Sequence, residues 1–199
     1  MLAYESPWLD EDLKLFRENV ARFIETEMVP HDAKWRKQHH VDRDLWRKAG
    51  DMGLLCLDLP AEYGCGGGDF RHEVVMYEEL SRRAISGFGQ GVHSMCAHYV
   101  YNYGTEEQKQ RWLSRLAKGE LIGAIAMTEP GAGSDLQGIR TRAVREGDHY
   151  RINGSKIFIT NGIHADLVIV AAITDPGKGA KGTSLFLVDT SLPGFVKGK

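Results

Sequence analysis

The apolar residues of this chain change their spacing once, near Glu120. Before that point they recur at the spacing of helical turns, and after it they alternate with polar residues. A period near 3.6 indicates amphipathic helices, whereas a period of two indicates half-buried strands. We therefore predict an α+β fold, with an N-terminal α-helical bundle in residues 1–120 and a mostly antiparallel β-domain in residues 121–199.

Several segments of the first part carry helix signals. The first stripe runs from Leu13 to Ile24, and Pro7 precedes it as a residue suited to a first helical turn. The other helical segments are Asp42 to Met52, ended by Gly53, Val92 to Tyr103, ended by Gly104, and a helix opened by the capping-box sequence Thr105–Gln108. Leucine- and glycine-rich loops are expected at 54–68 and 84–91.

The second part carries short strand signals separated by turn residues. Asn153-Gly154 is a strong signal for a two-residue hairpin turn, so the strands on either side of it are expected to pair. The predicted strands are Ile122–Met127, Ile139–Arg145, Tyr150–Ile152, Lys156–Thr160, Leu167–Ile173 and Ser184–Val188.

Composition excludes several classes of function. A net charge of −2 gives no electrostatic basis for binding nucleic acid, and no apolar run is long enough to span a membrane. The three cysteines lack a CxxC pair, which argues against a disulfide framework or a zinc site. His93 and His98 diverge by about 140° on a helix, so they predict no metal site. The N-terminus carries no leader pattern, and we expect a cytoplasmic protein.

A glycine-rich loop, Pro130-Gly-Ala-Gly-Ser-Asp135, follows the first predicted strand. Glycines let successive backbone N–H groups converge on an anion, and the Ser134 hydroxyl adds a donor, so the loop can hold a phosphate. It is not a dinucleotide fingerprint, because Leu136 stands where the third glycine is required. The same residues also suit an ordinary β-turn without a ligand, and the loop alone leaves both interpretations open.

Two sequence blocks resemble a known family in wording, spacing and order. The first reads IAMTEPGAGSDLQGI from Ile125, and the second reads FITNG from Phe158. Together they resemble the acyl-CoA dehydrogenases, and they look closest to the long-chain type. The resemblance implies an N-terminal helical domain, a middle β-domain and a C-terminal four-helix bundle, and the last is absent from this sequence. The family's catalytic base is a glutamate of that bundle, so we expect no catalytic residue within residues 1–199.

The resemblance implies that both blocks line an FAD cofactor. Met127 and Thr128 would meet the pyrimidine edge of the flavin, where a donor stabilises the negative charge of the reduced ring. Ser134 would touch the pyrophosphate and lie near bound substrate. The expected cofactor-binding residues are Ile125, Ala126, Met127, Thr128, Glu129, Pro130, Gly131, Ala132, Gly133, Ser134, Phe158, Ile159 and Thr160.

The second block carries its own expectations. Phe158 would cover one side of the flavin ring, and Ile159 and Thr160 would reach its N5 region. The resemblance gives phenylalanine at position 158 to long-chain relatives and tryptophan to medium-chain ones, which favours long acyl chains. The alternatives are an ordinary sheet core for Phe158 and Ile159, and a hydroxyl bonded to its own backbone for Thr128.

The implied reaction is the α,β-dehydrogenation of a fatty acyl-CoA thioester, with electrons passed to an electron-transfer flavoprotein. An intact family member would be a homo-oligomer, namely a tetramer. Two other interpretations remain. Acyl-CoA oxidases and flavin monooxygenases share the fold and return electrons to oxygen. A truncated, non-catalytic flavin-binding fragment is the other possibility.

Overall fold

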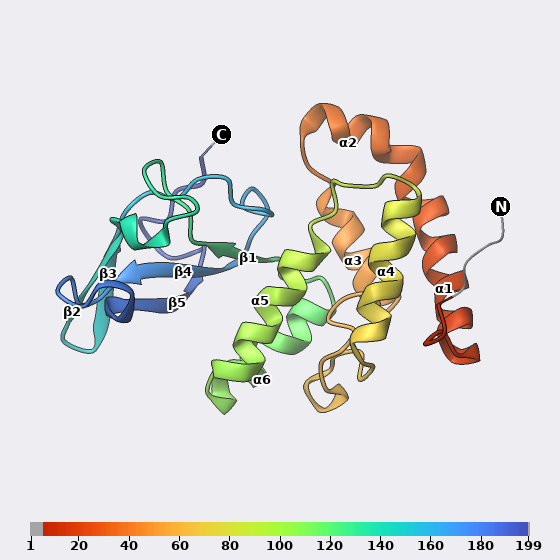
Figure 1. Cartoon of the computed structure of the whole chain (residues 1–199), viewed down its shortest axis with the longest axis horizontal. Coiled ribbons are helices and arrows are strands. Elements are labelled where there is room, and N and C mark those ends of the chain that lie inside the picture. The colour runs from red at the N-terminus through yellow and green to blue at the C-terminus, as the bar shows by residue number, and fades with distance from the viewer. Residues whose placement is uncertain (1–5, 199) are drawn as a thin grey trace. The chain divides into compact units, whose positions relative to one another are not determined.

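The computed structural model describes residues 6–198 (Figure 1). The chain divides into two compact units, which we call the helical unit, Met1–Leu121, and the sheet unit, Ile122–Lys199. Helices in the first unit and a mixed sheet in the second confirm the predicted α+β class.

Within residues 6–121 the helical unit has six α-helices, and a long connection, 52–69, separates α3 from α4. A π-helical turn, Ile24–Met28, and a 3₁₀ turn, Val29–His31, continue the first helix into the second. The helices are α1 (Glu11–Phe23), α2 (Asp32–Gln38), α3 (Arg43–Asp51), α4 (Phe70–Arg82), α5 (Gln90–Tyr103) and α6 (Glu106–Ala117).

Side-chain caps mark where α1, α4 and α6 begin. The predicted capping box of α6 is confirmed, because Thr105 Oγ1 accepts from the Gln108 N–H at 3.3 Å and Gln108 Oε1 accepts from the Thr105 N–H at 2.9 Å. In α1 the cap is Asp10, whose carboxylate accepts from the Leu13 N–H at 3.0 Å. The first-turn position predicted for Pro7 is therefore wrong. It lies in a turn before the helix.

The buried face of α5 differs from the predicted apolar stripe. Met95 is 50% exposed and Tyr103 is 81% exposed, although the helical spacing of apolar residues between Val92 and Tyr103 predicts that both lie on the buried face. Polar residues take the inner positions because they find partners there. Gln90 Nε2 and Ser94 Oγ donate to the buried Glu73 carboxylate of α4 at 2.5 and 2.8 Å. A hydrogen-bonded polar network thus replaces part of the expected apolar face, although Gln90 Oε1 is buried without a hydrogen-bond partner among residues 6–198.

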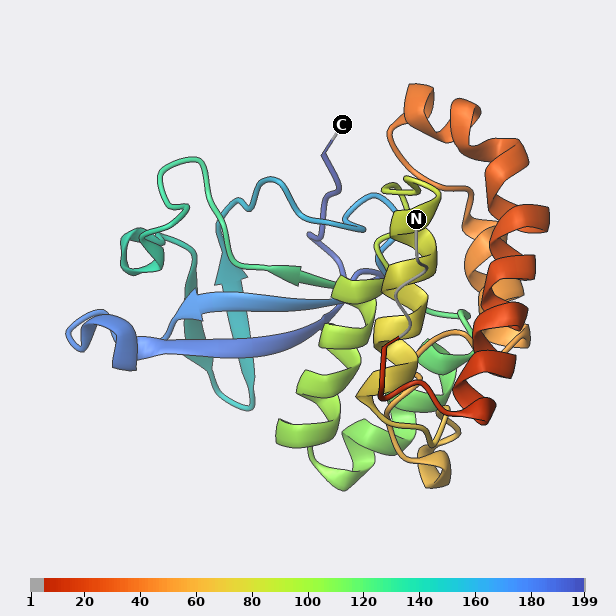
Figure 2. The ribbon, with the colours of Figure 1, turned by 45° about the vertical axis from the view of Figure 1, so that its right-hand side comes forward.

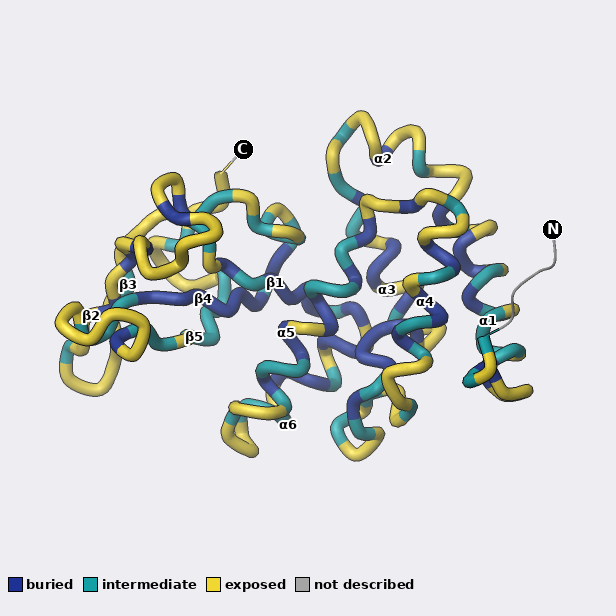
Figure 3. The backbone as a smooth tube through the Cα atoms, viewed as in Figure 1, coloured by how far each residue is buried: buried dark blue, intermediate teal, exposed yellow. Residues whose placement is uncertain are grey.

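The sheet unit is built around β4 (Leu167–Ile173), whose residues are almost all apolar and buried (Figure 3). A strand covered on both faces reads as a continuous apolar run, which explains this sequence. The other strands are β1 (Gly123–Ala126), β2 (Arg142–Glu146), β3 (His149–Asn153) and β5 (Thr183–Asp189).

The sheet is mixed in direction. Strand β1 pairs with β4 in parallel, and β2 meets β4 in parallel at Arg142 and Ile173. Strand β5 runs antiparallel along the whole of β4, and β2 and β3 form an antiparallel hairpin (Figure 2). The sheet order is β1-β4-β2-β3, with β5 also bound to β4. The parallel pairing holds the end of β1 beside a central strand.

Two strand-level predictions are wrong. The hairpin predicted at Asn153-Gly154, between 150–152 and 156–160, does not form; β3 pairs instead with β2, through a turn at Gly147-Asp148 where Gly147 has φ of +66°. Gly154 serves a close approach instead, because a Cβ there would lie 2.1 Å from Thr141 Oγ1. The segment 156–160 forms no strand. Its Ile157 N–H bonds to the Thr128 carbonyl at 3.0 Å, outside any strand ladder.

Candidate functional site

Two segments that are distant in the sequence meet just beyond the end of β1. Thr128 Oγ1 donates to the Ile157 carbonyl at 2.5 Å, and the Ile157 N–H donates to the Thr128 carbonyl at 3.0 Å. The Thr128 hydroxyl is thus bonded to backbone, as the simpler alternative proposed, although to a distant residue and not to its own. These two bonds join the Met127–Thr128 edge to the segment 156–160.

The glycine-rich loop begins as a tight two-residue turn. The Glu129 N–H donates to the Ala132 carbonyl at 2.8 Å, and the Ala132 N–H returns a bond to the Glu129 carbonyl at 3.0 Å. Neither Gly131 nor Gly133 has a positive φ, and a Cβ at either position would meet nothing within 4 Å. Backbone strain therefore does not require these glycines. A requirement for glycine at these two positions would come from a ligand that approaches the loop backbone.

Glu129 is the buried anchor of this loop. It is 7% exposed, and its carboxylate accepts from the backbone N–H groups of Arg140 and Thr141 at 2.6 and 3.0 Å. Lys156 Nζ donates to the same carboxylate at 2.8 Å. Burial raises the pKa of Glu129, but the bonds from Lys156 and from residues 140–141 outweigh it and lower the pKa to about 2. The Glu129 side chain is therefore ionised, and its hydrogen bonds hold the loop to residues 140–141 and to Lys156.

Phe158 is the most unusual residue of the site. Its side chain is 92% exposed, and its φ of +56° lies in the left-handed region. A bulky non-glycine residue rarely adopts this region, and such strain is concentrated at functional sites. The large aromatic ring therefore lies almost entirely in solvent. The sheet-core alternative for Phe158 does not describe this position.

The neighbours of Phe158 lie differently. Ile159 packs against the cluster of buried residues that includes Ala126 and Val168, so its side chain belongs to the core. Thr160 is exposed, and Asn161, with φ of +66°, donates from its side chain to the Gly123 carbonyl at 3.1 Å. This bond ties the end of the segment back to β1.

The structure brings the two predicted blocks together, but it gives their side chains unequal roles. The side chains of Ala126 and Ala132 are buried, so only their backbone groups can face a ligand. Gly133 and Ser134 lie on the exposed part of the loop. Sequence reasoning missed Lys156 as a site residue. Its only signal was a charged residue inside an otherwise strand-like run.

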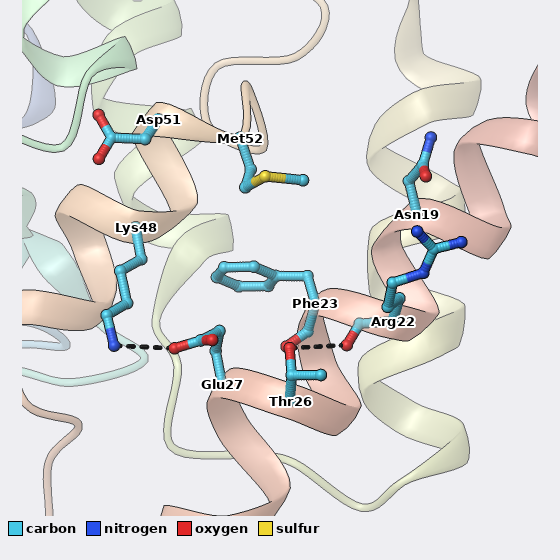
Figure 4. A pocket seen from close by; sticks show the side chains of 8 residues that line it. All are labelled: Asn19, Arg22, Phe23, Thr26, Glu27, Lys48, Asp51 and Met52. Atoms are coloured by element: carbon cyan, nitrogen blue, oxygen red, sulfur yellow. Dashed lines mark hydrogen bonds and ion pairs between the residues drawn. The ribbon is translucent and has the colours of Figure 1, made fainter.

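The helical unit has a separate hollow of about 420 Å³ beside α1 and α3 (Figure 4). Phe23 and Met52 supply apolar surface, and Lys48 is paired with Glu27 at 2.8 Å across the hollow. Its charges are of both signs, so it presents no clear selectivity for an ion. None of the predicted site residues lines it.

Two histidines of α5, His93 and His98, contact other groups of the helical unit. His93 is buried, and its Nε2 lies 3.1 Å from the Leu116 carbonyl, whereas His98 Nε2 lies 2.8 Å from Asp58. Burial lowers the pKa of His93 to about 4, so this ring is neutral near pH 7. Among residues 6–198, no cluster of three metal-ligating side chains forms, and no helix is long and apolar enough to cross a membrane.

Comparison with known proteins decides the family. Residues 10–120 match the model of the acyl-CoA dehydrogenase N-terminal domain, and residues 124–199 match that of the middle domain. The chain belongs to the acyl-CoA dehydrogenase family. The helical unit and the sheet unit thus correspond to the N-terminal and middle domains of this family.

The curated relatives differ in chain-length class. The chain is 46% identical over 188 residues to the long-chain specific acyl-CoA dehydrogenase, mitochondrial, of Sus scrofa, covering 93% of this chain and 44% of that protein. It is 43% identical over 193 residues to the short-chain specific acyl-CoA dehydrogenase of Clostridium acetobutylicum, covering 96% and 51%. The chain therefore spans about half the length of such relatives, and they do not resolve a chain-length class.

Solved structures agree with this family. The acyl-CoA dehydrogenase of Geobacillus kaustophilus is similar with a TM-score of 0.91 and 47% identity, over 96% of this chain and 51% of that one. A glutaryl-CoA dehydrogenase of Mycobacterium smegmatis in complex with FADH2 gives 0.86 and 37%, over 94% and 48%. A structure titled electron transferring flavoprotein of Acidaminococcus fermentans gives 0.88 and 39%, over 96% and 50%.

Proposed function

We propose that this chain is the N-terminal and middle part of an FAD-dependent dehydrogenase of fatty acyl-CoA thioesters, with long acyl chains favoured. Phe158 carries the proposal, because a 92% exposed aromatic ring in a strained backbone conformation is otherwise unexplained. The family membership and the relative solved with FADH2 support FAD as its ligand.

The residues present fit a flavin. Phe158 offers an apolar ring to a planar ligand, and Thr128 is fixed beside it by two hydrogen bonds to Ile157. Gly131 and Gly133 leave open space where a side chain would begin, which suits a phosphate approaching the backbone. The Ser134 hydroxyl stands at the exposed end of the same loop. The site thus offers a flavin an apolar surface, a polar edge and a loop that suits a phosphate.

Each part has a task in the proposed reaction. Bound FAD supplies the hydride acceptor for α,β-dehydrogenation. Phe158 would exclude water from one side of the ring, and the backbone donors near Thr128 would stabilise negative charge at the flavin edge. We expect the carboxylate that removes the α-proton to come from outside residues 1–199. An electron-transfer flavoprotein is the proposed electron acceptor, supported by the similar structure that bears that title.

FAD binding to the purified chain tests the cofactor assignment. Replacing Thr128 by valine removes the hydroxyl bond that ties the Met127–Thr128 edge to Ile157, and replacing Thr160 removes its proposed bond to the flavin. Each bond is worth about 0.5–1.5 kcal/mol, so we expect weaker binding or an altered reduction potential. Flavin fluorescence titration and spectroelectrochemistry measure the two quantities. Because the Thr128 hydroxyl donates to the Ile157 carbonyl, the double variant should lower the melting temperature of the sheet unit by several degrees, and binding is compared at a temperature where it stays folded. Unchanged affinity and potential in a folded double variant would contradict the assignment.

Turnover tests the position of the base. Purified residues 1–199, supplied with FAD, a long-chain acyl-CoA and an artificial electron acceptor, should show no steady turnover. Loss of a general base alone typically removes a factor of about 10² to 10⁴ in rate. Steady turnover above a protein-free control would show that a carboxylate within this chain serves as the base. Oxygen consumption by a longer parent protein would instead favour an oxidase or monooxygenase.

A further inference from the structure

The largely buried side chain of Lys156 joins the two segments of the candidate site. Its Nζ donates to the Met127 carbonyl and to Glu129 Oε1, both at 2.8 Å. Its side chain is only 10% exposed, and that of Glu129 is 6% exposed. Both acceptors lie in the first block, whereas Lys156 begins the segment that carries Phe158. The ammonium group therefore joins the first block to the segment 156–160 that leads into the second block.

The rest of the structure fixes the position of this charge. Glu129 is held by the backbone N–H groups of Arg140 and Thr141, so its carboxylate cannot follow a moving lysine. A buried ammonium needs a close anion and further acceptors, and this site supplies one of each. The Met127 carbonyl is consequently oriented by a charge that is itself locked to residues 140–141.

The Met127 carbonyl belongs to the peptide group whose N–H is that of Thr128. The other polar groups of Thr128 are committed, because its hydroxyl and its carbonyl both bond to Ile157. Within residues 6–198 the Thr128 N–H donates to no backbone carbonyl. A carbonyl that accepts from a cation polarises its peptide and makes the attached N–H a stronger donor, since hydrogen bonds in a chain strengthen one another.

We propose that Lys156 is a positioning residue for the flavin, which strengthens and orients the Thr128 N–H through the Met127 carbonyl. This inference rests on the proposed function. It predicts that a flavin at this edge is bound more tightly in its reduced, more negative form because of Lys156. Lys156 itself touches neither cofactor nor substrate, and Glu129 supplies the anion that keeps it charged.

The test compares three variants. Lys156→Met removes the ammonium and keeps the length of the side chain, and Lys156→Arg restores a cation. Lys178→Met is the matched control, because Lys178 lies in the same unit in an exposed ion pair with Asp175 at 2.8 Å. The double variant Lys156→Met with Glu129→Gln leaves no unpaired buried carboxylate, and it replaces the single variant if that one does not fold.

Two measurements separate the local effect from its consequence for the flavin. In the flavin-free chain, the ¹⁵N resonance of Thr128 should move upfield in Lys156→Met and stay in place in Lys178→Met. With FAD, Lys156→Met should bind up to about twofold more weakly, because the strengthening passed through one peptide group is about 10–30% of a single hydrogen bond, and its midpoint potential should fall. Lys156→Arg should return both quantities toward those of the unmodified chain.

The outcomes distinguish this inference from the proposed function. If the unmodified chain binds FAD and a folded Lys156→Met variant keeps the Thr128 resonance, the FAD affinity and the potential, Lys156 is not a positioning residue. The inference also fails if Lys178→Met gives the same changes. If the folded, unmodified chain binds no FAD, the proposed function fails and the inference fails with it, whatever the resonance of Thr128 does.

Discussion

Replacing Phe158 separates the demands of folding from those of binding. The side chain is 92% exposed, so truncation to alanine forfeits little buried surface. A fully enclosed phenylalanine buries about 150–250 Å² of surface. Phe158 covers roughly one twelfth of such an area, which at ~25 cal/mol per Å² contributes about 0.4 kcal/mol to the free energy of unfolding. Phe158→Ala should therefore change the free energy of unfolding by less than about 1 kcal/mol.

Phe158→Gly should be more stable than Phe158→Ala. Alanine keeps a side chain at φ of +56°, a conformation that costs roughly 1–2 kcal/mol, and glycine removes this strain. Glycine also adds about 0.5–1 kcal/mol of unfolded-chain entropy, which opposes the gain. The glycine variant should exceed the alanine variant by about 0.5–1 kcal/mol. Both should bind FAD more weakly, because each removes the aromatic ring.

The assay must report on the sheet unit. All four tryptophans lie in residues 1–121, so tryptophan fluorescence follows the helical unit. Hydrogen exchange of the β4 amides, Leu167–Ile173, follows the buried centre of the sheet. A loss of more than about 2 kcal/mol in Phe158→Ala would show that the ring is packed after all. A glycine variant no more stable than the alanine variant would refute the strain argument.

Other predictions concern the loop and the helical unit. Gly131→Ala and Gly133→Ala should raise the unfolding free energy by about 0.4–1 kcal/mol, because the added Cβ meets nothing and restricts the unfolded chain, yet each should weaken FAD binding in a fluorescence titration. Equal FAD affinity would favour a plain turn. His93 titrates near pH 4 when folded and near 6.5 when unfolded, so the unfolded state takes up the proton first as pH falls. Stability of the helical unit, followed by tryptophan fluorescence in urea, should fall by about 3 kcal/mol from pH 6.5 to 4. His93→Phe should remove that slope, and an unchanged slope would exclude His93 as its source.

The sequence by itself determined the elements whose signals are local. Helix α6 begins at its capping box because Thr105 and Gln108 satisfy each other within one turn. Strand β4 has the predicted bounds, since an apolar run of seven residues between turn residues suits a buried strand. The change of period near Glu120 likewise separated the helices from the sheet.

Only the tertiary structure decided features that depend on distant partners. Residues 156–160 alternate like a strand, but their backbone bonds to Thr128 and their Phe158 turns outward. The Asn153-Gly154 signal was overridden because Gly154 must pass close to Thr141. On α5, the buried Glu73 carboxylate made polar positions the inner face.

Lys156 shows the limit most clearly. A lysine in an apolar run carries no local sign of its partner, which lies 27 positions earlier in the chain. Local patterns record the period of burial and the satisfaction of nearby backbone groups. They do not record which buried charge compensates which, because that pairing exists only once the chain has folded and water has been excluded.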